Sequence, residues 1–338
     1  MAPTYKDIRD LTGVSLATIS KYFNGRSVLP ENRQRIERAV KELGYHVNDY
    51  ARGLRSRRSR TLGVVLAELN STFNTSIVSA MEERLREAGY GTIICDARGN
   101  SEVEAEAVQF LIGKMVDGIA IIPVADEVAG LAGVVDRGIP VVAIDRVPAG
   151  VAVDAVVIDN QAAIASAVEL LMAAGHRELA LLAGDDTTFT MRERRRGFRE
   201  AVKRHTGRYP RRSFAQPEQI SIEGGFDGMR RLLRLATPPT AVVCANYEFT
   251  LGATIALNES SGPALPAMVG FDNLELARII RPQPTLVAQP VAQLAAQAAE
   301  LILARMSGEL RGSSRTVVLP TELMVGDAST YQREGRGT

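Results

Sequence analysis

The chain has 338 residues, of which 46% are hydrophobic and 23% are charged, a balance typical of a folded protein with two or three domains. No apolar run approaches the roughly 18 residues of a membrane span, and the N-terminal segment MAPTYKDIRD has no apolar core of an export signal. We therefore expect a cytoplasmic protein that has no membrane partner.

The net charge of +1 is unevenly distributed along the chain. Residues 1–60 contain 13 Lys and Arg against 6 Asp and Glu, a net charge of +7, whereas the rest of the chain carries −6. A short basic segment joined to an acidic body is typical of a nucleic-acid-binding module with an appended domain. A solvated basic face without a partner would show the same asymmetry, so charge alone leaves both interpretations open.

Residues 4–24, TYKDIRDLTGVSLATISKYFN, predict two short helices joined at a glycine. Thr4 is a candidate N-cap with an acidic residue at capping-box spacing, Gly13 ends the first helix, and Ser15 can cap the second. A third helix is expected over residues 30–43. Two short helices around a glycine, the second rich in small residues, predict a helix-turn-helix, because small side chains let a helix approach base edges in the major groove.

The segments GVSLATISKYFNG, ENRQRIERAVKELGY and NDYARGLRSRRSRTLGVVL resemble the N-terminal part of lactose-repressor-type (LacI/GalR) bacterial transcription regulators. The order and spacing of the segments agree, and the resemblance extends over roughly residues 3–330. It implies a regulator, most often a repressor, that binds double-stranded operator DNA as a homodimer. Two half-sites are needed because one small helix-turn-helix makes too few contacts for specificity.

Carried over by position, the resemblance assigns base reading in the major groove to Leu16, Ala17 and Lys21. Leu16 and Ala17 offer only apolar contact to thymine methyl groups, which leaves Lys21 as the expected guanine reader. The residues expected to hold phosphates and fix the register are Thr4, Ser15, Thr18, Ser20 and Asn24.

Residues 48–60 are the expected hinge between a headpiece at residues 1–47 and the body. The segment contains five arginines and no continuous apolar face, so it is too short and too polar to form a stable helix alone. The resemblance implies that it folds when two copies pair on DNA. Leu54 then wedges between base steps of the minor groove, and Arg55 lies beside it on the DNA.

From Thr61 onward, short β-branched runs alternate with segments of helical spacing, which predicts an α/β fold with parallel sheets. The resemblance implies a two-lobed, periplasmic-binding-protein-like body over residues 61–330. One lobe is expected near 61–158 and 290–318, and the other near 159–289 and 319–330. The expected strands are 61–66, 91–95, 118–122, 140–144, 155–158, 178–183, 241–244 and 267–271.

Polar residues follow several of these strands, at the edge where α/β sheets bind ligands. By resemblance the effector-binding residues are Phe73, Asn74, Asp145, Arg146, Arg192, Arg194, Asn246 and Asp272. Asp, Asn and Arg side chains hold vicinal hydroxyls in bidentate fashion, and Arg holds carboxylates or phosphates equally well. Asn246 and Asp272 have an alternative role, because each could instead cap the helix that follows it.

The expected effector is a small polar metabolite, first a sugar or sugar acid, then a nucleobase or phosphorylated metabolite. Ile220 stands where many sugar-binding members carry an aromatic residue, so stacking on that side of the ligand is in doubt. The sequence shows no phosphate loop, nucleophile elbow or metal-ligand spacing, and its two cysteines predict buried thiols. We expect no cofactor, no metal and no enzymatic activity.

Two other classes of function stay open at this point: a cytosolic solute-binding or sugar-modifying protein with an accessory DNA-binding head, and an architectural DNA binder. Residues 331–338 are polar and lack heptads, so we expect a disordered tail that forms no tetramer-making coiled coil. A dimer formed through the body is therefore expected.

Overall fold

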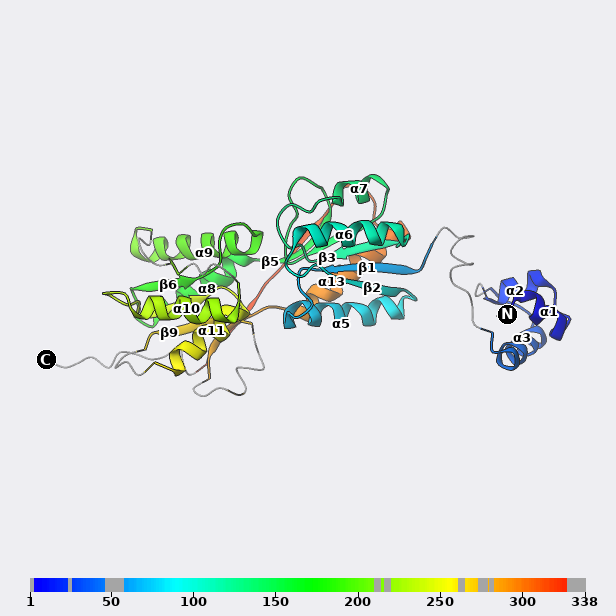
Figure 1. Cartoon of the computed structure of the whole chain (residues 1–338), viewed down its shortest axis with the longest axis horizontal. Helices are drawn as coiled ribbons and strands as arrows, with labels where there is room; N and C mark the ends of the chain where they lie inside the picture. The colour runs from blue at the N-terminus through cyan, green and yellow to red at the C-terminus, as the bar shows by residue number, and fades with distance from the viewer. Residues whose placement is uncertain are drawn as a thin grey trace. The chain divides into compact units, whose positions relative to one another are not determined.

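The computed structural model divides the chain into two compact units, Met1–Arg60 and Thr61–Thr338 (Figure 1). It describes residues 3–23, 26–45, 58–209, 214–215, 220–260, 265–272, 279 and 283–326. Three of the expected DNA-contacting residues, Asn24, Leu54 and Arg55, lie outside these residues, as do most of the hinge and residues 331–338.

The first unit contains the helices α1 (Tyr5–Thr12), α2 (Leu16–Phe23) and α3 (Pro30–Leu43). The predicted capping box begins α1, because Thr4 N–H donates to Asp7 Oδ2 at 2.6 Å and Lys6 N–H donates to Thr4 Oγ1 at 3.2 Å. Gly13 ends the helix in the left-handed conformation, with φ of 67°.

The headpiece core is small and closed by aromatic rings. Ile8, Ile19 and Ile36, one from each helix, are fully buried. The rings of Tyr5 and Phe23 stack at a centroid distance of 5.1 Å. Because α2 turns Ile19 toward this core, its opposite face is left to solvent.

The second unit is a two-lobed α/β body. The sheet of the first lobe has the strand order β11-β5-β4-β3-β1-β2, and every pairing in it is parallel. The helices α6 and α7 cover one face of this sheet, and α5 and α13 cover the other (Figure 1). The bounds are β1 (Thr61–Leu66), α5 (Thr72–Glu87), β2 (Gly91–Asp96), α6 (Ser101–Gly113), β3 (Gly118–Ile121), α7 (Leu131–Asp136), β4 (Val141–Ile144), β5 (Asp154–Ile158), α13 (Val291–Ser307) and β11 (Thr316–Leu319).

The sheet of the second lobe repeats the order, as β12-β10-β9-β8-β6-β7. The helices α8 and α9 pack on one face, and α10 and α11 on the other (Figure 1). The bounds are α8 (Asn160–Ala173), β6 (Leu179–Leu182), α9 (Phe189–Thr206), β7 (Phe214–Ala215), α10 (Ile222–Leu233), β8 (Ala241–Cys244), α11 (Tyr247–Asn258), β9 (Ala267–Phe271), β10 (Thr285–Ala288) and β12 (Glu322–Met324).

Side chains of the central strands are buried on both faces. In β1, Leu62 and Val64 join the core formed with α5 and α13, whereas Val65 joins the core formed with α6 and α7. The continuous apolar runs of the sequence therefore correspond to strands covered on both sides, as the predicted parallel sheet requires.

The described chain passes between the two sheets after β5, after β10 and after β11. The strands β7, β10, β11 and β12 are absent from the predicted set, and β12 pairs antiparallel with β10. Among the helices that the structure describes, none is long and apolar enough to cross a bilayer.

Candidate functional site

Helix α2 presents the expected base-reading residues outward. Leu16 is 38% exposed, and Ala17 and Lys21 are exposed as well, whereas Ile19 on the opposite face is fully buried. This orientation is fixed by packing within the headpiece and needs no DNA. The three side chains thus form one solvent-facing surface on a short helix.

The expected phosphate-contacting residues surround that surface with hydroxyl groups. Ser15 Oγ accepts a hydrogen bond from Thr18 N–H at 3.2 Å and lies 2.9 Å from Thr18 Oγ1, so it caps α2. Thr4 is exposed at the start of α1, and Ser20 is half-buried. Ser15 and Thr18 therefore lie at the N-terminal end of α2, where the partial positive charge of the helix favours an anion.

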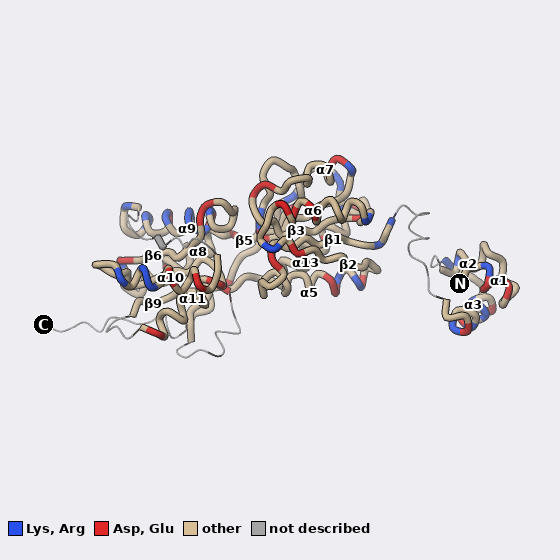
Figure 2. Tube along the Cα trace, in the orientation of Figure 1, with Lys and Arg blue, Asp and Glu red and all other residues tan. Residues whose placement is uncertain are grey.

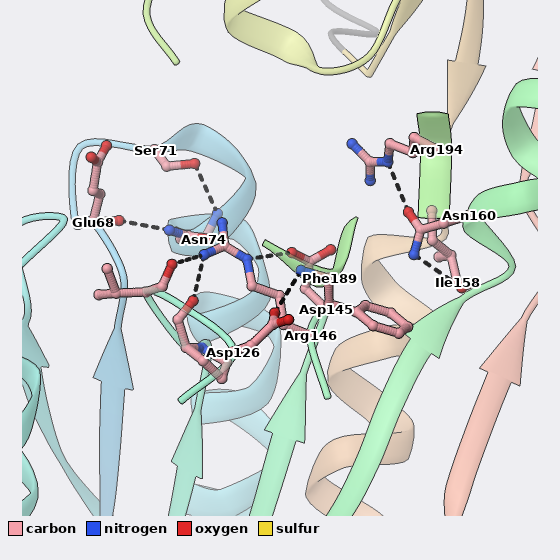
Figure 3. Close-up of polar contacts among 12 residues, drawn as sticks. Glu68, Ser71, Asn74, Asp126, Asp145, Arg146, Ile158, Asn160, Phe189 and Arg194 are labelled. Atoms are coloured by element: carbon pink, nitrogen blue, oxygen red, sulfur yellow. Dashed lines mark hydrogen bonds and ion pairs between the residues drawn. The ribbon is translucent and has the colours of Figure 1, made fainter. Parts of the chain in front are cut away.

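In the body, the approach of α9 to α8 places Arg194. A Cβ atom at Gly197 would lie only 2.5 Å from the carbonyl oxygen of Gln161, so only glycine allows the two helices to pack this closely. At this separation Arg194 Nε donates to Asn160 Oδ1 at 2.8 Å (Figure 3). The close contact between α8 and α9 thus fixes the position of Arg194.

The guanidinium of Arg194 is buried at the end of the second sheet. Its exposed fraction is 3%, its Nη1 donates to Ala245 O at 2.6 Å, and its Cζ lies 3.9 Å from the ring centroid of Phe271. Burial lowers the pKa of Arg194, and the carboxylates of Asp145 and Asp272 oppose that effect. Both carboxylates therefore act on this one guanidinium, although Asp145 comes from the first lobe.

Asp272 directly follows β9. Its Oδ2 accepts from Gln289 Nε2 at 2.5 Å, and its Oδ1 accepts from Gln289 N–H at 3.2 Å. Burial raises the pKa of Asp272 to about 6, against the opposing effects of the Gln289 hydrogen bonds and of Arg194. The side chain therefore titrates just below neutral pH.

Asp145 and Arg146 follow β4 and form an ion pair, with 3.5 Å between Arg146 Nε and Asp145 Oδ2. The same arginine donates through Nη1 to Pro123 O at 2.6 Å and to Val124 O at 2.5 Å (Figure 3). We call Asp145, Arg146, Arg194 and Asp272 the strand-end cluster.

The remaining expected ligand contacts have other partners in the structure. Asn74 Nδ2 donates to Glu68 O at 2.9 Å (Figure 3), and Asn246 Oδ1 caps α11 by accepting from Phe249 N–H at 2.9 Å. Phe73 is half-buried and packs against the core. Asn246 therefore has the capping role that the sequence left open, whereas Asp272 accepts from Gln289 as described above.

Arg192 lies on the exposed side of α9, a helix on which basic residues recur (Figure 2). Its Nη1 forms an ion pair with Asp126 Oδ2 at 2.6 Å. Its neighbour Arg194 points to the buried side instead. The two arginines of one helix therefore face different surroundings.

Several buried polar residues of the site were not predicted. Asn160 and Gln289 orient Arg194 and Asp272, and each follows a strand, which is the signal that could have revealed them. Glu104 is fully buried in α6, where Oε1 accepts from Val124 N–H at 2.7 Å. Burial raises the pKa of Glu104 to about 7. Burial also raises the pKa of Glu248, and the negative charge of Glu248 opposes the lowering of the Arg194 pKa.

Two protein families match the chain. Residues 4–48 match the family described as bacterial regulatory proteins, lacI family. Residues 59–311 match the family described as periplasmic binding proteins and sugar binding domain of LacI family.

Curated relatives match over nearly the full length. Catabolite control protein A of Priestia megaterium is 27% identical over 319 residues, covering 93% of this chain and 96% of that protein. The HTH-type transcriptional repressor PurR of Vibrio cholerae is 29% identical over 315 residues, covering 90% of this chain and 91% of the repressor.

Solved structures of similar proteins extend the match to the fold. The lac repressor dimer bound to operator and the anti-inducer ONPF is 25% identical, with a TM-score of 0.86 and coverage of 97% of this chain and 99% of that one. The transcriptional regulator CelR in complex with cellobiose is 30% identical, with a TM-score of 0.72 and coverage of 96% and 99%.

Proposed function

Because the chain belongs to the LacI family of bacterial regulatory proteins, we propose that it is a repressor that binds an operator as a homodimer and responds to a neutral sugar. In this proposal residues 1–47 bind DNA, residues 48–60 form the hinge, and residues 61–330 bind the effector and dimerise. The observation that carries the proposal is the outward face of α2, which presents Leu16, Ala17 and Lys21 while Ile19 holds the helix to the core.

The proposed DNA contacts divide into two kinds. Lys21 donates to a guanine, and Leu16 and Ala17 contact thymine methyl groups. The hydroxyl groups of Thr4, Ser15, Thr18 and Ser20, together with Asn24, contact phosphates, and Leu54 and Arg55 contact the minor groove.

Selection of binding sites from random DNA duplexes by the full-length protein tests this assignment. The expected product is a pseudo-palindrome, and Lys21→Ala should weaken binding to it by about 1–3 kcal/mol while relaxing the preference at one base pair in each half-site. Arg26→Ala, which removes a basic residue that is also exposed, is the matched control for charge. An equal loss for Lys21→Ala on selected and random DNA would show that Lys21 contacts only phosphate.

The charges around Arg194 favour a neutral effector over an anionic one. Asp145, Asp272 and Glu248 act on this guanidinium as negative charges, and Arg146 acts as a positive one. Acidic groups therefore outnumber basic groups when all are ionised. Arg146 Nη1 and Arg194 Nε and Nη1 also donate to protein oxygens already, which leaves fewer N–H groups to hold a carboxylate or phosphate. Sugar hydroxyls can instead donate to the carboxylates.

A thermal-shift comparison tests the effector class. Cellobiose and ribose are suitable neutral probes because similar proteins have been solved with them, and gluconate and ribose 5-phosphate are anionic counterparts. A bound ligand at 100 times its Kd stabilises the protein by about 2.7 kcal/mol. We expect the stabilising compounds of a wider metabolite screen to be neutral. Stabilisation by anions alone would contradict the charge argument.

Homodimerisation is proposed through the body. Strand β2 is an edge of the first sheet, and Ile94 on it is 45% exposed, so the edge offers an apolar surface that a second copy can cover. Sedimentation equilibrium should give a dimer at micromolar concentration, and Ile94→Lys should shift it toward monomer. A stable tetramer would contradict the proposal.

A further inference from the structure

Helix α9, which carries Arg194, begins without a cap from its own N-cap residue. The side chain of Thr188 makes no capping hydrogen bond, and its buried Oγ1 has no hydrogen-bond partner among the described residues. The helices α8 and α11 differ, because Asp159 and Asn246 cap them in the ordinary way. The first amide groups of α9 must therefore find an acceptor elsewhere.

That acceptor is Asp126, which follows β3 in the first lobe. Its Oδ1 accepts from Phe189 N–H at 2.7 Å (Figure 3), and its Oδ2 forms the 2.6 Å ion pair with Arg192 Nη1. A carboxylate at a helix N-terminus is favoured both by the free amide groups and by the helix dipole. One side chain of the first lobe thus caps a helix of the second.

The segment that carries Asp126 is itself fixed within the first lobe. Glu104 accepts from Val124 N–H at 2.7 Å, and Arg146 donates to Val124 O at 2.5 Å. Ala149 N–H donates to the carbonyl oxygen of Asp126 at 2.6 Å. Because its backbone is held on several sides, Asp126 transmits the position of the first lobe to α9.

We propose that Asp126 is a positioning residue that joins the two lobes and sets the place of α9, and with it Arg194, relative to the first sheet. The link to ligand binding rests on the proposed function, which assigns Arg194 to the effector. The capping contact between the lobes stands apart from that assignment. It predicts that loss of the Asp126 carboxylate releases the lobes even when no ligand is present.

The test measures the distance between the lobes in the full-length protein. Spin labels are attached at Glu106→Cys on α6 and Asp227→Cys on α10, both exposed, in a Cys95→Ser background, whereas Cys244 is fully buried and stays unlabelled. Labelled protein is diluted with unlabelled protein so that pulsed electron resonance reports distances within one chain. We expect Asp126→Ala to broaden and shift the distance distribution. Arg192→Gln should do so less, because the cap to Phe189 remains.

Combining the two substitutions separates a shared contact from two unrelated effects. The double variant should show no more change than Asp126→Ala alone, because both remove the same carboxylate contact. Asp126→Asn retains an oxygen that can accept from Phe189 N–H, so it should lie between the wild type and Asp126→Ala. Glu127→Ala removes the same charge one residue along, at an exposed position, and should match the wild type.

An Asp126→Ala distribution identical to those of the wild type and Glu127→Ala would overturn the inference. If Asp126→Ala fails to fold, the isosteric variant Asp126→Asn and the variant Arg192→Gln test the inference instead. Wild-type distance distributions in both of these variants would overturn it. Neither DNA nor ligand enters the measurement. Failure of the proposed function, seen as no selected operator or no stabilising metabolite, is therefore distinguishable from failure of this inference.

Discussion

The two lobes place an aspartate at the same point of the same fold. Asp145 follows β4 and Asp272 follows β9, and each donates its backbone N–H to the neighbouring strand, to Val156 O at 2.9 Å and to Val287 O at 2.8 Å. Both residues adopt the left-handed conformation, with φ of 68° and 58°. This conformation is costly for most residues with a side chain, and Asp tolerates it better than most. The fold therefore repeats a strained turn that presents a carboxylate.

The surroundings of the two carboxylates differ. Asp145 has Arg146 as its neighbour in the chain. Asp272 instead accepts hydrogen bonds from the neutral amide of Gln289, and its nearby positive charge comes from Arg194 in α9. Burial accordingly raises the pKa of Asp272 to about 6. Equivalent backbone positions thus acquire different surroundings, and burial raises the pKa of the carboxyl group in the second lobe.

The largest effect on effector binding is expected when Asp272 loses the positive charge of Arg194. Arg194→Ala should abolish the response to an effector, with a loss of about 2–5 kcal/mol of effector-binding free energy, because it leaves the buried Asp272 without a nearby positive charge. Arg146→Ala should cost less, since Arg146 is more exposed. Calorimetric titration with a sugar found in the metabolite screen measures both. Arg196→Ala on the exposed side of α9 is the control. Equal losses of binding free energy for Arg146→Ala and Arg194→Ala would contradict the expected difference between the two lobes.

A helix glycine of the second lobe lies in a close helix contact, whereas one of the first lobe does not. A Cβ atom at Gly252 in α11 would lie 2.0 Å from Ile222 O and 2.5 Å from Phe226 N of α10, whereas Gly113 at the end of α6 has open space around it. Gly252→Ala should destabilise the body by about 3 kcal/mol. Gly113→Ala should instead stabilise it by about 0.4–1 kcal/mol by restricting the unfolded chain. Urea unfolding of both variants tests the contrast, which would fail if the two changes had the same sign.

Much of this fold was accessible from the sequence, because strands buried on both faces appear as β-branched runs and the headpiece helices carry their own caps. The strands β7 and β12 escaped prediction because they have only two and three residues, and β11 pairs with β5, which is distant in sequence. In the site, Asp145 and Asp272 were found because they directly follow strands. Asn160 follows a strand as well, but its partner Arg194 could not be predicted because it depends on how α8 meets α9. Asp126 was missed because its role depends on how the lobes meet, which no local pattern encodes.

A third prediction concerns the buried carboxyl group of the first lobe. Because burial raises the pKa of Glu104 to about 7, ionised Glu104 costs the folded state up to about 3 kcal/mol. The protonated carboxyl group therefore favours the folded state. This stabilisation is fully present below the unfolded pKa near 4.5 and is lost as the pH rises through about 7. Glu104→Gln retains an acceptor for Val124 N–H and does not titrate. Its stability relative to the wild type should therefore increase between pH 5 and pH 8 in urea unfolding. Parallel pH profiles for the two proteins would disprove the shift.

The smallest effect concerns the pH dependence of effector binding. In the proposed site sugar hydroxyls would donate to the ionised form of Asp272, so binding should weaken as the pH falls below about 6, by at most about 1.4 kcal/mol per pH unit. Asp272→Asn should bind more weakly at neutral pH and show a flat profile. Asp145→Asn serves as the comparison in the other lobe. If its profile were flattened instead, the titrating carboxylate would lie in the first lobe.

A ligand-responsive regulator requires the strand-end cluster and the DNA-binding surface to be coupled, and one titration measures that coupling. The affinity of the full-length protein for its selected operator is measured by fluorescence anisotropy, with and without a saturating neutral sugar from the metabolite screen. We expect the sugar to change operator affinity by about 5–150-fold in the wild type and to leave that of Arg194→Ala unchanged. Unchanged operator affinity in the wild type at saturating sugar would contradict this coupling.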